Sequence, residues 1–171
     1  MTTHPKSHVM ESNGGELVVS IRDYETRTTF ADRLRRRNGT DRWAFMLWAL
    51  PPGFDDEVPV TKLPLTHFLQ AAGSAEAMTL QIRKPGGQQW GADYVKYAIG
   101  HPHPDVQDPA IDVAITIPAE TLWVTTFEVF EAEEAADLFY TYFKTNDIPP
   151  DYTLRPLEGY TTDRRIIEIP S

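Results

Sequence analysis

The chain contains no cysteine, which excludes disulfides, thiolate nucleophiles and cysteine-ligated zinc. It has no apolar run approaching the ~18 residues that a membrane-spanning helix needs, so no membrane partner is expected. The first fifteen residues lack the apolar stretch of a signal peptide. We therefore expect a cytoplasmic protein with a flexible leader over residues 1–15 and a single globular α+β domain over residues 16–171.

Signatures of catalysis and of cofactor binding are missing as well. There is no G-x-S-x-G nucleophile elbow, and Lys84-Pro85-Gly86-Gly87 lacks the G-x-x-x-x-G-K-[ST] pattern of a phosphate-binding loop. His101-Pro102-His103, with Asp105 nearby, has metal-ligand residue types, but a proline follows each histidine and favours a solvated loop. We predict no catalytic residue, no metal and no cofactor, and therefore not an enzyme.

The charge of the chain is unevenly distributed. The formal net charge is −9. From Asp105 onward there are 14 acidic and 4 basic residues, a net of −10, whereas the preceding segment has 11 acidic and 12 basic residues, a net of +1. Nucleic acid is not an expected partner, because phosphate contacts require clustered Lys and Arg. A basic protein partner would suit this acidity, although solubility alone explains it equally well.

Two charged groups have local explanations. Glu131, Glu133 and Glu134 fall at the start of a predicted helix, where they complement the positive end of its dipole. The arginines between residues 33 and 37 lie on the outer side of another predicted helix. They form an exposed helix face, pair with the acidic helix or contact a partner.

The apolar patterns predict an α+β fold with mostly antiparallel sheet of about seven strands and three short-to-medium helices. Helices are expected from a cap at Thr28 or Thr29 to a stop at Asn38, over 64–72, and over 131–145 with an apolar stripe. Strands are expected over 16–22, 43–50, 78–84, 94–99, 111–117, 121–130 and 165–169. The alternation over 78–84 places Met78, Leu80 and Ile82 inside and Thr79, Gln81 and Arg83 outside, and Trp123, Phe127 and Val129 share one side of the strand over 121–130.

Two exposed segments are candidates for contact with a partner. Phe54, Asp55, Asp56 and Glu57 open a loop after a predicted central strand, and Trp90 lies in the turn of a predicted hairpin. Aromatic anchors within a polar rim are typical of protein interfaces. The alternatives are aromatics that plug the ends of the sheet and carboxylates that are merely solvated.

The tail carries the most specific pattern. Residues 145–160 read TNDIPPDYTLRPLEGY, after an aromatic helix and before a short strand. This segment resembles the C-terminal signature of actinobacterial immunity proteins similar to the immunity factor for tuberculosis necrotizing toxin. Asn146 stands where the family pattern has glycine. Tyr152 and Tyr160 are expected to pack, and Arg155 to pair with Glu158 or with a carboxylate of the last helix.

The resemblance implies a function that composition does not. Such proteins bind a cognate secreted toxin, which resembles an NAD(+) glycohydrolase, and block its access to NAD. The chain would then be an immunity protein that needs no catalytic residue. An alternative is a small ligand-binding domain or enzyme with a pocket near the His101–His103 loop, lined also by Tyr94 and Lys96. A third is an adaptor without inhibitory activity.

Overall fold

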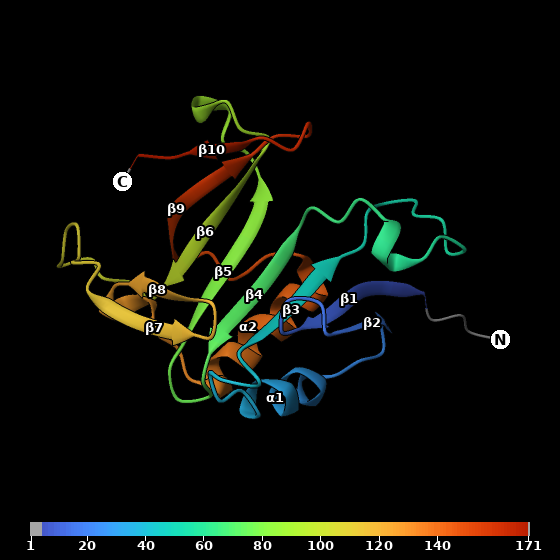
Figure 1. The fold of residues 1–171 in the computed structure, drawn as a ribbon, viewed down its shortest axis with the longest axis horizontal. Helices are drawn as coiled ribbons and strands as arrows, with labels where there is room; N and C mark the ends of the chain where they lie inside the picture. The colour runs from blue at the N-terminus through green and yellow to red at the C-terminus, as the bar shows by residue number, and fades with distance from the viewer. Residues whose placement is uncertain (1–4, 171) are drawn as a thin grey trace.

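The structure, a computed structural model, describes residues 5–170, which form an eight-stranded antiparallel sheet, a two-stranded sheet and two α-helices (Figure 1). The order in the large sheet is β10-β9-β6-β5-β4-β3-β1-β2. Every pairing in it is antiparallel. The strands are β1 (Lys6–Ser12), β2 (Leu17–Arg22), β3 (Ala44–Ala49), β4 (Phe68–Gly73), β5 (Met78–Pro85), β6 (Tyr94–Gly100), β9 (Thr153–Tyr160) and β10 (Ile166–Glu168).

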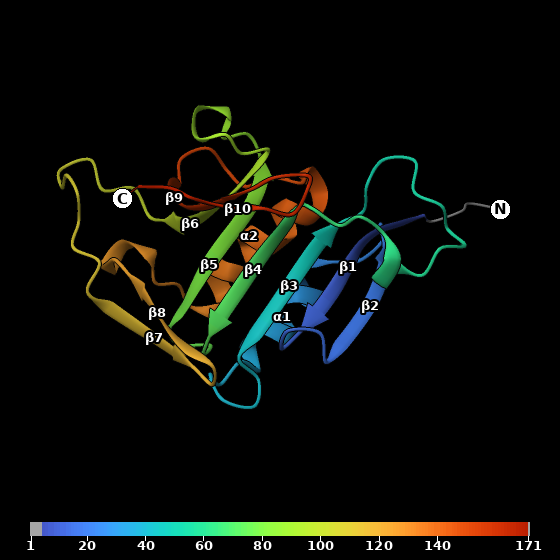
Figure 2. The same ribbon diagram turned by 45° about the horizontal axis from the view of Figure 1, so that its top comes forward.

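The two helices lie on one side of this sheet, behind the strands in Figure 2. They are α1 (Arg27–Arg35) and α2 (Ala132–Thr145). The small sheet is the hairpin of β7 (Val113–Ile117) and β8 (Glu120–Val124). Three short 3-10 turns complete the described elements: η1 (Val60–Lys62), η2 (Gln88–Trp90) and η3 (Thr126–Glu128).

The core lies between the helices and the sheet. The predicted stripe of α2 is confirmed, because all five of its members are buried against strand side chains: Ala132, Ala135, Ala136, Phe139 and Phe143. Phe139 meets Phe45 of β3 with ring centroids 5.2 Å apart, and Phe143 meets Phe30 of α1 at 5.3 Å. Burying one such side chain stabilises the fold by roughly 1.5–3 kcal/mol.

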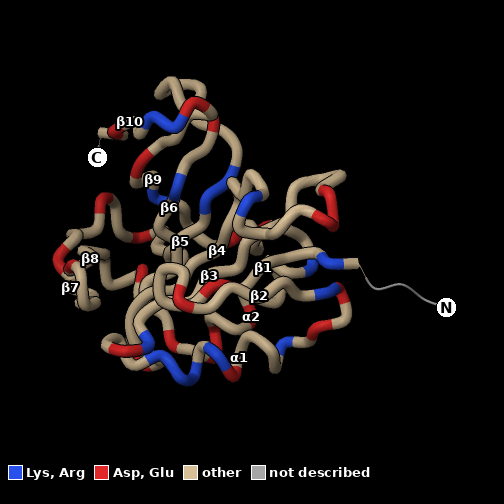
Figure 3. Tube along the Cα trace, turned by 45° about the vertical axis from the view of Figure 1, so that its right-hand side comes forward, with Lys and Arg blue, Asp and Glu red and all other residues tan. Residues whose placement is uncertain are grey.

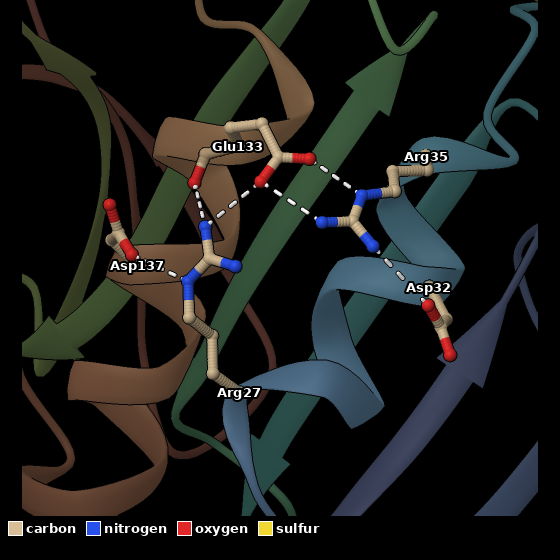
Figure 4. A network of polar contacts seen from close by, with 5 residues as sticks. All are labelled: Arg27, Asp32, Arg35, Glu133 and Asp137. Atoms are coloured by element: carbon tan, nitrogen blue, oxygen red, sulfur yellow. Dashed lines mark hydrogen bonds and ion pairs between the residues drawn. The ribbon is translucent and has the colours of Figure 1, made fainter.

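Charged side chains join the helices at the surface. Arg27 and Arg35 of α1 bond to Glu133 of α2, and Arg27 also bonds to Asp137 (Figure 4). α1 carries three arginines and one aspartate, so Lys and Arg positions predominate along it (Figure 3). Arg35 therefore pairs with the acidic helix, which was one of the interpretations left open. Arg37, expected on the outer side, is instead buried and donates to the Arg33 and Ala44 carbonyls.

The flexible leader expected over residues 1–15 is wrong for most of its length. Lys6–Ser12 forms β1, which pairs with both β2 and β3, and residues 1–4 lie outside the described part. The strand is inconspicuous because its inward side chains are His8 and Met10, both buried. His8 becomes compatible with the core by bonding to Asn146 and Ser7.

The helix expected over 64–72 is also wrong, so the described residues hold two α-helices instead of three. Phe68–Gly73 is the central strand β4. Nearly all of its residues are buried, since the helices cover one face and other side chains cover the opposite face. Such a strand has no period of two, and its apolar residues matched a helical stripe equally well.

The described residues form ten strands instead of the seven expected, because β1, β4 and β9 were not anticipated. β9 contains Pro156 and Gly159, both poor strand formers. Its pairing with β6 shifts register between Glu158 and Pro156, and this irregularity accommodates the proline. The other predicted strands are confirmed, with β8 ending at Val124 and not at residue 130.

Candidate functional site

Strand alternation gives the large sheet a second face, turned away from the helices. Met78, Leu80 and Ile82 of β5 are 0% exposed on the helix side, as predicted. Gln81 and Arg83 therefore point to the opposite side. The cross-strand partners of these two residues on that face are Gln70 and Ala98, and Phe68 and Lys96.

Two segments border this uncovered face. The loop over residues 51–67 lies over Val9 and Trp48, where its Leu63 and Leu65 help enclose a hollow of about 360 Å³. The β7–β8 hairpin covers the other end, with buried Ile117 and Val124. Between these borders partly exposed side chains remain on the four central strands β4, β5, β6 and β9, namely Gln70, Gln81, Lys96 and Glu158.

A hollow of about 480 Å³ lies between the hairpin and the central strands. Its floor is polar for a sheet interior, with Gln70, Gln81 and Lys96 from three adjacent strands. Its lining residues are Trp43, Gln70, Ala72, Gln81, Lys96, Ala98, Ile117, Glu120, Leu122, Trp123, Val124, Arg155, Leu157 and Glu158. It is an open depression with hydrogen-bonding side chains at its floor and apolar ones on its hairpin side.

Charged groups on this floor are paired within the chain. Lys96 Nζ lies 3.1 Å from Glu158 Oε1, and the Tyr160 hydroxyl donates to the same carboxylate. Burial alone would raise the pKa of Glu158, but the hydrogen bond from Tyr160 and the charge of Lys96 outweigh it, and the pKa lies below its ordinary value. Glu158 is therefore ionised at neutral pH.

Arg155 has a different partner from those expected. It bonds to both carboxylate oxygens of Glu128, at 2.9 and 3.0 Å, and Glu128 is 3% exposed. Glu128 belongs to η3, just before α2, and it also accepts a bond from the Thr125 amide. The expectation that Arg155 pairs with Glu158 or with the last helix is therefore wrong. Its partner Glu128 lies in η3, the turn that precedes the last helix, and the Glu128 side chain reaches β9.

The rim of the face carries an exposed aromatic side chain. Trp123 of β8 is 58% exposed, although it lines the hollow beneath it. The sequence predicted Trp123 on one side of a strand over 121–130, together with Phe127 and Val129. The strand instead ends at Val124 and belongs to a hairpin separate from the main sheet, so that only one side of β8 is covered. An exposed tryptophan beside a polar depression is a typical interface anchor.

The predicted contact residues do not form one patch. Asp55, Asp56 and Glu57 are exposed in the border loop, where Asp56 pairs with Lys6 at 3.2 Å and Phe54 is half-buried. Trp90 of η2 is half-buried against Ala92, Val95 and Ile169. In Figures 1 and 2 the border loop and the β5–β6 turn that holds η2 lie at separate ends of the molecule.

The two histidines of the 101–103 loop point to different surroundings. His101 stacks on Phe130 at 4.4 Å and bonds to Glu134 Oε1 at 2.7 Å, and Glu134 also accepts from the Tyr152 hydroxyl. His103 lines a hollow of about 690 Å³ beside Arg155 and Glu128. Among the described residues, no group of three or more His, Asp or Glu side chains is placed to hold a metal ion.

Part of this face was visible in the sequence. The alternation that put Met78, Leu80 and Ile82 inside also placed Gln81 and Arg83 outside. Gln70 fell within the helix expected over 64–72, and Trp123 within a strand expected over 121–130. Arg155 was expected to pair with Glu158 or with the last helix. Arg155, Glu158 and Tyr160 of the tail motif all belong to β9 and face this side.

Within residues 5–170, neither helix has the length and apolar character needed to cross a bilayer. Comparison with protein-family models, with curated proteins and with solved structures finds no match to this chain.

Proposed function

We propose that the chain is an immunity protein that binds a cognate secreted toxin through the uncovered face of the sheet and covers the toxin's active site. The observation that carries the proposal is the place of the tail motif. Its Arg155 and Glu158 lie on β9 and line the same depression as the exposed Trp123. The segment that resembles immunity proteins therefore contributes to a depression on the face turned away from the helices, which supports a role of this face in binding.

The size of the face agrees with a protein partner. The four central strands, about 4.8 Å apart, make the accessible part of the sheet roughly 15–20 Å wide. A standard protein interface buries about 800 Å² on each partner, so the hairpin and the border loop would also take part in the contact. Polar groups paired in advance, such as Lys96 with Glu158, enter an interface without an unpaired buried charge.

The toxin class comes from the resemblance of the tail. We propose a toxin with NAD(+) glycohydrolase activity, encoded beside this chain. Inhibition by occlusion requires no catalytic group in the inhibitor. The acidic residues of the last third contribute less to binding than their number indicates, since Glu133, Asp137, Asp147 and Glu158 pair with cations of the first hundred residues.

The test is co-expression with the product of the neighbouring toxin gene. We expect a stable complex, loss of NAD hydrolysis by the toxin and restored growth of the host cell. Trp123→Ala should weaken binding at least tenfold, since hot-spot aromatics cost about 2 kcal/mol or more on truncation. Leu17→Ala is the matched control, because Leu17 is 55% exposed on the outermost strand β2.

Two results would contradict the proposal. One is the absence of a complex between the folded proteins. The other is a complex whose affinity is unchanged by both Trp123→Ala and Gln81→Arg, which fills the depression from its floor. The second result would place the contact on another surface.

A small-ligand function has one observation in its favour, the hollow of about 690 Å³ beside His103. Two of its charged residues, Arg155 and Glu128, bond to each other, and His103 Nδ1 bonds to the Val106 carbonyl. These groups are therefore not free to bind a ligand. Tyr94 and Lys96, expected to line the same pocket, line two other hollows. The protein-binding function therefore has the stronger support.

A further inference from the structure

A separate hollow on the same face has an unusual composition. It lies where β4 begins and β9 ends, and its volume is about 640 Å³. It contains two arginines, two tyrosines and three threonines, and no acidic residue of the described chain lines it. The lining residues are Leu63, Pro64, Leu65, Thr66, Arg83, Tyr94, Tyr160, Thr161, Thr162, Arg164 and Ile166. In a chain of net charge −9, this hollow is locally cationic.

Arg83 is held rigidly in this hollow. Its guanidinium carbon lies 4.9 Å from the ring centre of Phe68, 4.8 Å from that of Tyr160 and 5.6 Å from that of Trp48. Nε donates to the Thr66 carbonyl at 2.7 Å, and Nη2 lies 3.4 Å from the Leu65 carbonyl. Aromatic stacking and these carbonyls fix the plane of the guanidinium before any ligand arrives.

The charge of Arg83 has no direct counter-ion. Arg83 forms no ion pair with any carboxylate in residues 5–170, and three of its five N–H donors lack an acceptor there. Glu158 forms its ion pair with Lys96, and Asp93 accepts a hydrogen bond from the Thr162 amide. Burial lowers the pKa of Arg83, and burial together with the charge of Arg83 lowers that of His67.

A second cation lies at the rim. Arg164 is exposed in the turn between β9 and β10, in the left-handed region at φ 69, and forms no ion pair with a described residue. Its neighbour Arg165 does pair, with Asp163. The turn thus brings Arg164, which has no carboxylate partner within residues 5–170, to a hollow that Arg83 also lines.

We propose that this hollow binds an oxyanion, a carboxylate or a phosphate, with Arg83 as the recognising group and Arg164 as a rim cation. A planar guanidinium presents its donors in a fork that matches both anions, and a fixed fork loses little entropy on binding. Tyr94, Leu65 and Ile166 give the hollow apolar walls, so the anion would be part of a larger molecule. The inference concerns this chain alone and holds with or without the toxin.

The competing explanation is purely structural. Arg83 bonds to carbonyls of the border loop, so it helps hold that loop on the sheet. A structural role predicts that substitution loosens the fold, and it predicts no saturable anion binding. The two explanations therefore differ in a direct titration.

The experiment is an NMR titration that follows the Nε–Hε signals of the arginines. Inorganic phosphate, and separately N-acetylglutamate amide, are added to the full chain at constant ionic strength set with NaCl, so that screening does not change. We expect the Arg83 signal to shift saturably with at least one of the two. Saturation by phosphate alone assigns a phosphate ligand, and saturation by the carboxylate assigns an acidic side chain of a partner.

Variants test the assignment. Arg83→Lys, in which binding is followed through the Nε–Hε signal of Arg164, keeps the charge but loses the fork, and should weaken binding roughly tenfold. Arg164→Gln, at an exposed position that does not endanger folding, should weaken it roughly two- to fivefold. Arg36→Gln, a substitution of an exposed arginine at the C-cap of α1, should leave it unchanged. An Arg83 signal unmoved by both anions, or equal binding by Arg83→Lys, Arg164→Gln and the original chain, would overturn the proposal.

Discussion

Arg35 on α1 and Glu133 on α2 are joined by two hydrogen bonds, from Nε to Oε1 at 2.6 Å and from Nη2 to Oε2 at 3.1 Å. Arg27 bonds to the same carboxylate at 3.1 Å, so one glutamate holds two arginines of the neighbouring helix (Figure 4). The acidic first turn of α2 thus has two functions. It complements the helix dipole, and it fastens α1 over the core.

This arrangement predicts an acid-sensitive contact. Hydrogen bonds from Arg35 and Arg27 lower the pKa of Glu133 to about 2. Because the folded-state pKa lies below the ordinary value near 4.5, the contact stabilises fully above pH 4.5 and is lost as the pH falls towards 2. We expect Glu133→Gln to lower the urea midpoint at pH 7, with a smaller difference from the original chain at pH 3.

Glu131→Gln is the matched control. Glu131 is exposed and precedes α2, and it makes no ion pair with the described residues. Its substitution should leave the midpoint nearly unchanged at both pH values. Equal effects of the two substitutions at pH 7 would mean that the dipole, and not the arginine contacts, accounts for the acidity of this turn. High salt should reduce the effect of Glu133→Gln, since the pair is exposed to solvent.

The contact between Arg155 and Glu128 predicts a larger effect. Removing one partner of a buried pair leaves an uncompensated charge, which costs about 3–5 kcal/mol. Since Glu128 is almost fully buried, Arg155→Met should destabilise the fold by about 3 kcal/mol or more. The measurement is urea unfolding at pH 7.

The double variant Glu128→Gln/Arg155→Met separates charge from packing. It removes both charges, and the introduced glutamine keeps a carbonyl for the Thr125 amide, which now donates to Glu128. We expect it to be more stable than Arg155→Met alone. A double variant that is less stable would show that the arginine contributes mainly through the packing of its aliphatic part.

His8 predicts a second pH dependence, at higher pH. It is 3% exposed, and burial lowers its pKa below 6.5, against the opposing effect of its bond to Asn146. The unfolded chain therefore binds more protons than the folded chain below pH 6.5, so the free energy of unfolding decreases as the pH falls through this range. His8→Gln should flatten the decrease between about pH 6.5 and 5, measured by urea unfolding at successive pH values.

His67 serves as the comparison for that experiment. Burial and the charge of Arg83 lower its pKa too, so it contributes with the same sign. It is half-buried, whereas His8 is almost fully buried, and its effect should be the smaller one. A chain whose stability is independent of pH between 6.5 and 5 would contradict both assignments.

The sequence predicted the fold best where periodicity was undisturbed. The stripe of α2 and the alternation of β5 each appear as expected, because each element buries one face only. Prediction was wrong for β4, where burial on both faces removes the period, and for β9, where a register shift admits Pro156. The prediction of a flexible leader was wrong because the sequence does not show how His8 can be buried. Its hydrogen-bond partners are the neighbouring Ser7 and the distant Asn146.

The candidate site was less predictable than the fold. Sequence alternation indicates which side chains leave the core, but it does not show whether another segment then covers them. Gln81 and Arg83 were placed outside, yet only the position of the β7–β8 hairpin and of the loop over residues 51–67 turns that face into two hollows. Trp123 needed the same information, since its exposure depends on the hairpin standing away from the main sheet.

The asparagine at position 146, where the resembled pattern has glycine, has a structural explanation that leads to the last prediction. Asn146 ends α2 in the left-handed region, at φ 58 and ψ 25, where glycine is favoured and asparagine is the usual substitute. Its side chain also accepts a bond from His8 Nε2 at 2.7 Å. The asparagine therefore meets the backbone requirement that glycine meets elsewhere, and it adds a link between α2 and β1.

Two substitutions separate these roles. Asn146→Gly keeps the backbone conformation and loses the bond, and should cost about 1 kcal/mol. Asn146→Ala loses the bond and also places a Cβ in the left-handed region, which adds roughly 1 kcal/mol or more. In urea unfolding we expect the original chain to be most stable, the glycine variant intermediate and the alanine variant least stable. Equal stability of the two variants would mean that the helix end carries no backbone strain, and a glycine variant as stable as the original chain would mean that the bond to His8 contributes nothing.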